Sequence, residues 1–504
     1  MNTFNRKSLT AAVLAGLGVA GTAHAVYQDP NGLGQALIYP YYSVQNNAAA
    51  GTSNNTYINV VNTTNTGKVV KVRFREGKAS REVLDFNLYL SPFDVWTAAL
   101  IPTDATSAAG TALITSDKSC TNPSLYSGAN LIGRAEFRNF QYAGVNDDGL
   151  GTGLDRTREG YAEMIEMAVL QGTALAAATH SAAGVPTCTG LVGLVVLPAL
   201  TPLTLPTGGL MGSGTLINVI AGSDSGYKAT ALSNVTAVAI YSEIGTETGN
   251  FTAATPTSIV VANNFAYLSS FAPFNAGAIP GGVDAVSTTM MHATVINELV
   301  LDTATRSNTD WVMTFPTKWY YYADPTPVTP FTAVFGAQGA CETIAVSFWN
   351  REESVASPLL PDFSPKPPPG AAAGNTLCYE STVISWRNGA SQMPTNTSGP
   401  LGSLNYRGID VTPGLQAGWA AVTFNGNNAS QVGIVSLPGS SINLATGAAA
   451  VPGANTFFGL PVVGFMVRSF VNGTIPATAP ATGTVLSAYS SAFDHSFRQR
   501  ITPP

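Results

Sequence analysis

Several segments of this chain alternate apolar and polar residues with a period of two, and this pattern constrains the fold most strongly. In the clearest one, residues 70–75, valine and phenylalanine alternate with three basic residues, Lys71, Arg73 and Arg75. A β-strand points successive side chains to opposite faces, so this segment predicts a half-buried strand. The three basic side chains are then expected on the solvent-facing side.

Similar segments recur between loops rich in Gly, Pro, Asn, Thr and Ser. They are 84–90, 161–169, 310–315, 343–349, 379–386, 419–424 and 462–471. A short Ala-rich helix is expected near residues 174–179. The sequence therefore predicts an all-β fold with two or more β-sandwich domains, of immunoglobulin-like or Greek-key type, with long loops rich in Gly, Pro and Thr.

Two stretches rich in Pro and Gly divide the chain. Residues 271–282 mark the expected boundary between an N-terminal β-sandwich region, 26–280, and a C-terminal one, 281–504. Residues 357–370 contain a run of prolines and predict an extended loop.

Residues 1–25 have the pattern of a signal peptide. Arg6 and Lys7 precede an uncharged run from 9 to 20, and Ala23-His24-Ala25 places small residues at −3 and −1. Cleavage is expected before Val26, so we expect export to the cell surface, the medium or the periplasm. No transmembrane helix is expected, because the run is shorter than the roughly 20 residues that cross a bilayer.

Four cysteines in a chain predicted to be exported indicate two disulfide bonds rather than a metal site. They are Cys120, Cys188, Cys341 and Cys378, and no CxxC motif occurs. Three pairings are open. The simplest joins 120 with 188 and 341 with 378, because each bridge then closes one loop within one half.

Only 10% of the residues are charged. Removing Arg6 and Lys7 from the 23 basic residues leaves 21 against 29 acidic ones, a net charge of −8. This balance argues against a nucleic-acid partner. A low density of charge also lets neighbouring protein surfaces approach at little desolvation cost, which suits packed assemblies.

Signatures of catalysis are missing from the sequence. The one match to a dinucleotide-binding turn, residues 16–21, lies inside the predicted signal peptide. His180, His292 and His495 follow no nucleophile pattern and are expected to be structural. A glycosidase would need two paired carboxylates, whereas the simpler interpretation is surface charge. The available glutamates are Glu159, Glu163, Glu166, Glu352 and Glu353.

One loop is a candidate metal site. Asp147, Asp148 and Asp155, close to Gly149, would supply the hard oxygen ligands that Ca²⁺ prefers. Their spacing does not follow the EF-hand pattern, and Asn, Asp and Gly also favour turns for local reasons. No other cofactor is expected.

Four tracts resemble uncharacterised, exported β-rich proteins of Gram-negative bacteria, for which no activity is known. The tracts are 36–44 (ALIYPYYSV), 72–77 (VRFREG), 84–92 (LDFNLYLSP) and 309–318 (TDWVMTFPTK). The resemblance implies an exported protein with a β architecture, and it assigns no catalytic residue.

The leading functional hypothesis is a non-enzymatic, extracytoplasmic structural or surface protein that self-assembles or contacts other cell-surface components. In one version, residues 26–44 donate a strand to a neighbouring copy. A second hypothesis is a secreted glycan-binding or glycan-active protein, because sugars stack on aromatic faces. Its candidates are Trp311, Trp319, Tyr320 to Tyr322, Trp349, Trp386 and Trp419. A third is an outer-membrane β-barrel, which shares export and alternating strands.

Overall fold

The computed structural model describes most of the chain after the predicted signal peptide. The described residues are 24–47, 52–106, 108–126, 132–191, 204–246, 248–275, 277–322, 328–352, 355–356, 375–389, 396–411, 414–424, 433–447, 453–476 and 482–502. Residues 1–23 of the signal peptide, the predicted loop 357–370 and Glu353 lie outside these ranges.

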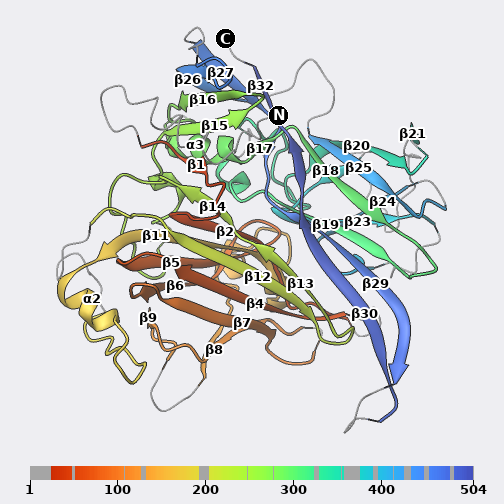
Figure 1. Ribbon diagram of the computed structural model, residues 1–504, viewed down its shortest axis with the longest axis horizontal. Coiled ribbons are helices and arrows are strands. Elements are labelled where there is room, and N and C mark those ends of the chain that lie inside the picture. Colours follow the sequence, from red (N-terminus) through yellow and green to blue (C-terminus); the bar gives the residue numbers. More distant parts are fainter. Residues whose placement is uncertain are drawn as a thin grey trace.

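Two large sheets form a first β-sandwich (Figure 1). Sheet 1 has, in spatial order, β1 (Tyr27–Gln28), β14 (Thr230–Ser233), β2 (Ala36–Ser43), β11 (Glu159–Leu170), β5 (Gly67–Glu76), β6 (Glu82–Leu90) and β9 (Cys120–Asn122). Sheet 2 has β10 (Gly133–Glu136), β8 (Thr111–Thr115), β7 (Val95–Pro102), β4 (Thr52–Asn62), β12 (Leu210–Asn218) and β13 (Ser223–Lys228), with β3 (Asn46–Asn47) paired to β4.

The core of this sandwich follows from the two-residue alternation. Val72 and Leu88 of sheet 1 belong to one buried cluster with Val60, Trp96 and Leu100 of sheet 2. All five side chains have no exposed surface. The apolar half of each alternating strand therefore fills the space between the two sheets.

Two further sheets form a second sandwich. Sheet 3 has β21 (Val355–Ala356), β20 (Glu342–Asn350), β25 (Ala417–Phe424), β18 (Thr294–Val300) and β31 (Ser496–Arg498), with β22 (Thr376–Leu377) paired to β20. Sheet 4 has β24 (Tyr406–Asp410), β23 (Ser381–Arg387), β19 (Asn308–Thr314), β29 (Phe465–Pro476) and β30 (Thr484–Asp494). Only β23 and β24 run parallel among these pairs.

Sheet 4 is buried on both faces. Trp311 and Met466 pack in a cluster with Val346 of sheet 3. Their sequence neighbours Val312 and Phe465 belong instead to the core cluster of the first sandwich. Sheet 4 therefore joins the two sandwiches through apolar contacts.

Within the described residues, a smaller sheet and two short helices complete the fold. Sheet 5 has β15 (Thr257–Ala262), β16 (Phe265–Ser270), β26 (Gly433–Asn443), β27 (Gly453–Phe458) and β32 (Arg500–Thr502), and β17 (Met291–His292) pairs with β28 (Leu460–Pro461). The helices are α2 (Gly172–Ala178) and α3 (Gly282–Thr289), with 3-10 turns at Gly144–Asn146, Leu154–Arg158, Phe251–Ala253 and Lys318–Tyr320. β15 and β16 precede the expected boundary at 271–282, yet they share a sheet with strands that follow it.

These elements confirm the all-β expectation. The strand β2 lies between β14 and β11, and all eight of its residues are buried. The segment 26–44 therefore pairs within its own chain. Donation of this segment to a neighbouring copy would have to displace that pairing, and the donor-strand version stays a prediction that deletion of residues 26–44 tests. No helix among the described residues is long and apolar enough to span a membrane.

Candidate functional site

The basic residues of β5 do not face solvent, so that expectation was wrong. Lys71, Arg73 and Arg75 are at most 1% exposed. Lys71 pairs with Asp85, Arg73 Nε lies 2.8 Å from Glu82, and Arg75 Nε lies 3.3 Å from Glu163. The segment 243–249 covers this face, and its carbonyl oxygens accept further hydrogen bonds from Lys71 and Arg73. The charges are therefore internal ion pairs.

Three glutamates of the predicted carboxylate pool, Glu159, Glu163 and Glu166, are likewise buried on β11 rather than displayed on the surface. Glu166 accepts from Lys68 Nζ at 2.9 Å and from the backbone N–H of Thr207 and Gly208. Burial raises the pKa of Glu166, and Lys68 opposes that shift. Glu163 takes Arg75. Glu352 is exposed at the end of β20.

Glu159 holds the two halves of the molecule together. Its carboxylate accepts from Tyr41 Oη at 2.8 Å, and from the backbone N–H of Leu404 at 3.0 Å and of Asn405 at 2.9 Å. The glutamates of β11 thus have separate partners. The structure gives no two of them a shared site of the kind that a glycosidase uses.

Sequence reasoning missed one buried acid, Glu380. Neither of its carboxylate oxygens has a hydrogen-bond partner among the described residues, and burial raises its pKa to about 8. Lys318 opposes that shift, although its own Nζ donates to the carbonyls of Ala340 and Cys378. Glu380 lies in the alternating segment 379–386, directly before β23, but alternation does not show that its side chain is buried.

None of the three histidines forms a catalytic relay. His180 Nδ1 lies 3.6 Å from Asp94 Oδ2 and 3.4 Å from Ser91 Oγ. Both contacts use the same nitrogen, whereas a relay needs one partner at each nitrogen. His292 and His495 are buried, and burial lowers their pKa values to about 3 and about 4.

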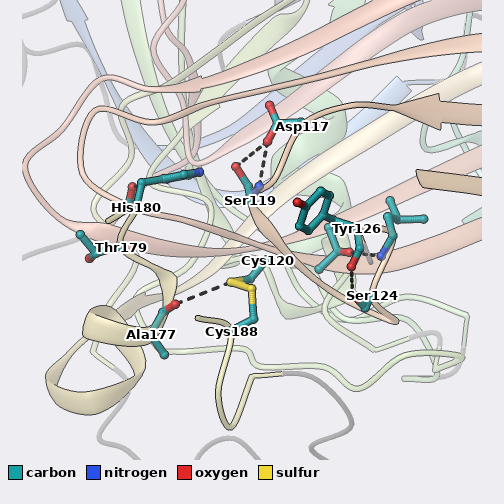
Figure 2. The surroundings of a disulfide bond; sticks show 12 residues. Asp117, Ser119, Cys120, Ser124, Tyr126, Ala177, Thr179, His180 and Cys188 are labelled. Carbon is teal, nitrogen blue, oxygen red and sulfur yellow. Dashed lines mark hydrogen bonds between the residues drawn. A yellow bond between two sulfur atoms is a disulfide. The ribbon is translucent and has the colours of Figure 1, made fainter. Parts of the chain in front are cut away.

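Both disulfides join the cysteines of the simplest pairing, Cys120 with Cys188 and Cys341 with Cys378. Figure 2 shows that the first connects β9 to the loop after α2, where the Sγ of Cys120 also lies 3.7 Å from the carbonyl oxygen of Ala177. Asp117 and Ser119, just before β9, are hydrogen-bonded to each other. This bridge therefore anchors α2 to the edge of sheet 1.

The three aspartates of the candidate calcium loop have separate surroundings. Asp148 binds Arg156 through two contacts of 2.6 and 2.7 Å, and Asp147 accepts from the N–H of Gly149. Asp155 lies in the first turn of the 3-10 helix Leu154–Arg158. Within the described ranges, no group of three or more His, Cys, Asp or Glu side chains is placed to hold a metal ion.

The calcium hypothesis stays a prediction with a direct test. If Ca²⁺ binds at Asp147, Asp148 and Asp155, EDTA will lower the melting temperature of the mature protein, because a ligand that binds only the folded state stabilises it. Differential scanning calorimetry with EDTA and then with added Ca²⁺ measures this. An unchanged melting temperature would remove the hypothesis.

The aromatic candidates separate into core and surface. Trp311 and Trp386 have no exposed surface and pack edge to face at 4.8 Å. Trp319 stacks on Tyr320 at 3.8 Å and lies beneath the Arg75 guanidinium at 4.7 Å. Trp349 and Trp419 lie instead on the outward side of sheet 3, and Trp419 is 36% exposed.

The outward side of sheet 2 is a continuous surface over four neighbouring strands. Burial alternates strictly along β4 and β7, with Ile58 and Trp96 inside and Tyr57 and Val95 outside. We call the outward residues of β4, β7, β8 and β12 the uncharged face. They are Ser53, Asn55, Tyr57, Asn59, Val61, Val95, Thr97, Ala99, Ile101, Ile114, Met211, Ser213, Thr215 and Ile217.

The uncharged face has neither acidic nor basic side chains, and it exposes apolar groups. β4, β7, β8 and β12 contain no Lys, Arg, His, Asp or Glu at all. Tyr57, Val95 and Met211 are 38%, 47% and 45% exposed. Cross-strand register sets Tyr57 between Thr215 and Ala99, near the middle of the face.

The charged residues of sheet 2 are confined to its two edge strands. Asp224 and Lys228 lie exposed on β13, and Arg134 and Glu136 lie exposed on β10. Charged residues on edge strands discourage edge-to-edge pairing with another chain. The sheet is therefore protected at its edges and unprotected across its face.

Comparison with models of protein families, with curated proteins and with solved structures found no match to this chain.

Proposed function

We propose that this chain is an exported, non-enzymatic surface protein that self-assembles, and that the uncharged face is the contact between copies. The observation that carries the proposal is the lack of charge on four adjacent, solvent-facing strands. Two such faces can pack as the sheets of a sandwich do, without stripping water from ionised groups.

The area of the uncharged face fits a weak contact between two copies. Four strands about 4.8 Å apart, each about eight residues long at about 3.3 Å per residue, cover roughly 500 Å². Two copies would bury roughly 1,000 Å² together, which is the lower limit for a specific interface. Because both copies use the same face, this contact by itself closes a two-fold dimer of modest stability.

Other observations support the export and the non-enzymatic character that we propose. The two disulfides suit an oxidising compartment outside the cytoplasm. The glutamates of β11 and the histidine His180 already bind protein partners, as described above, and so favour structural roles.

Sedimentation velocity on the protein from Val26 onward, at several concentrations, tests the assembly. The wild type is expected to sediment faster as its concentration rises. Tyr57→Lys is expected to remain monomeric, because it places an ammonium group in the centre of the contact.

Tyr489→Lys provides the matched control. Tyr489 is an exposed tyrosine of β30, outside the uncharged face, so this variant should assemble as the wild type does. A wild type that is monomeric at every concentration would contradict the proposal, and so would equal behaviour of the two lysine variants.

A further inference from the structure

Two tryptophans stack against each other on the outward side of sheet 3. Trp349 of β20 lies directly opposite Trp419 of β25, with ring centroids 3.9 Å apart and planes 13° apart. Their sequence neighbours Phe348 and Ala420 are buried on the other side of the same sheet. The two largest apolar side chains at this position are therefore directed away from the core.

Polar groups of both signs flank the indole pair. Glu298 of β18 is the direct cross-strand partner of Trp419, so its side chain lies on the same side of the sheet as the two indole rings. Its carboxylate is 47% exposed and forms an ion pair with Arg468. At the end of β20, Arg351 Nη2 donates to Gln416 Oε1 at 3.2 Å.

A stacked indole pair flanked by polar side chains complements the surface of a sugar. A pyranose ring has a flat C–H face, which packs on an aromatic ring, and a rim of hydroxyl groups, which exchange hydrogen bonds with carboxylate, amide and guanidinium groups. The carboxylate of Glu298 is already paired with Arg468, and the guanidinium of Arg351 donates to the amide of Gln416, so hydrogen bonds to the hydroxyl groups of a neutral polymer suit the site.

We propose that Trp349 and Trp419, with Glu298, Arg351 and Gln416, form a binding site for a neutral hexose polysaccharide. The pyranose ring packs on the exposed part of Trp419, and the flanking polar groups bind its hydroxyls. The site is on a different sheet from the uncharged face, so it does not depend on the assembly proposal.

Affinity electrophoresis tests the site directly. The protein from Val26 onward is run in native gels that contain dextran, mixed-linkage β-glucan, galactomannan or polygalacturonate, one polymer per gel. The wild type is expected to be retarded by at least one neutral polymer. Trp419→Ala should weaken that retardation about tenfold, since an aromatic stacking contact has roughly that effect on affinity.

Three variants control for other causes. Tyr489→Ala removes an exposed aromatic ring from sheet 4, outside both proposed contacts, and should leave the retardation unchanged. Glu298→Gln and Trp419→Tyr keep the size and shape of the site and should weaken binding less than Trp419→Ala does. They also keep the test decisive if Trp419→Ala does not fold, which circular dichroism would reveal.

The proposal is overturned if no neutral polymer retards the wild type. It is equally overturned if folded Trp419→Ala binds as well as the wild type. If Trp419→Ala does not fold, it is overturned when both milder variants bind as well as the wild type. Either result would make the stacked pair purely structural. Retardation by polygalacturonate alone would overturn the assignment to neutral sugars.

Discussion

Replacing Arg156 by alanine is expected to destabilise the protein by about 3–5 kcal/mol, which is the usual cost of leaving a buried ion-pair partner alone. Arg156 binds Glu76 at 2.8 and 3.0 Å and Asp148 at 2.6 and 2.7 Å. It also lies over the ring of Tyr142 at 4.3 Å. Its loss would leave the buried carboxylate of Glu76 without its described counter-charge, and would leave Asp148 with only the half-exposed Arg81, 3.5 Å away.

Urea unfolding at pH 7 measures this loss, and Arg134→Ala is the matched control. Arg134 pairs with Glu136 at 3.3 Å on the exposed edge of sheet 2, where such a pair contributes less than about 1 kcal/mol. Burial would raise the pKa of Asp148, but Arg156 holds it below its ordinary value. The destabilisation should therefore shrink below pH 4, and a loss as small as that of Arg134→Ala would contradict the argument.

Glu380→Gln should stabilise the protein increasingly as the pH rises from 5 to 8. In the folded state burial raises the pKa of Glu380 from 4.5 to about 8. Between these values the folded chain keeps a proton that the unfolded chain releases. Stability therefore falls with rising pH by about 1.4 kcal/mol per unit from this group. Glutamine does not titrate, so the variant loses that slope.

Urea midpoints of wild type and variant at pH 5, 6.5 and 8 test this expectation. The two proteins should differ least at pH 5 and most at pH 8. Glu136→Gln, which makes the same substitution on an exposed edge, is the matched control. A difference between wild type and Glu380→Gln that does not change with pH would show that Glu380 is ionised throughout.

The elements of the fold were predictable because their signal is local. The alternation at 343–349 and 419–424 corresponds to β20 and β25, and the Ala-rich stretch at 174–179 corresponds to α2 within two residues at its start. Side chains alternate along a strand whatever it pairs with, so each segment carries its own evidence.

The environment of the polar side chains was not predictable, because it depends on distant segments. Arg75 alternates with apolar residues as a solvent-facing side chain would, yet Glu163 and the ring of Trp319 cover it. Similarly, nothing near Trp349 in the sequence indicates that it stacks on Trp419 while Trp386 is buried. Alternation separates the two faces of a strand, but it does not say whether the polar face meets water or another part of the chain.

The strand pairs of sheet 5 determine the order in which parts of this sheet can fold. β16 pairs with β26, and β27 pairs with β32, which ends at Thr502. Contacts between segments so distant in sequence form slowly, because a long stretch of chain must first close into a loop. Because the chain is made from the N-terminus, the edge of β16 that pairs with β26 stays unpaired until β26 has been made. The last described strand, β32, is thus also needed to complete the sheet.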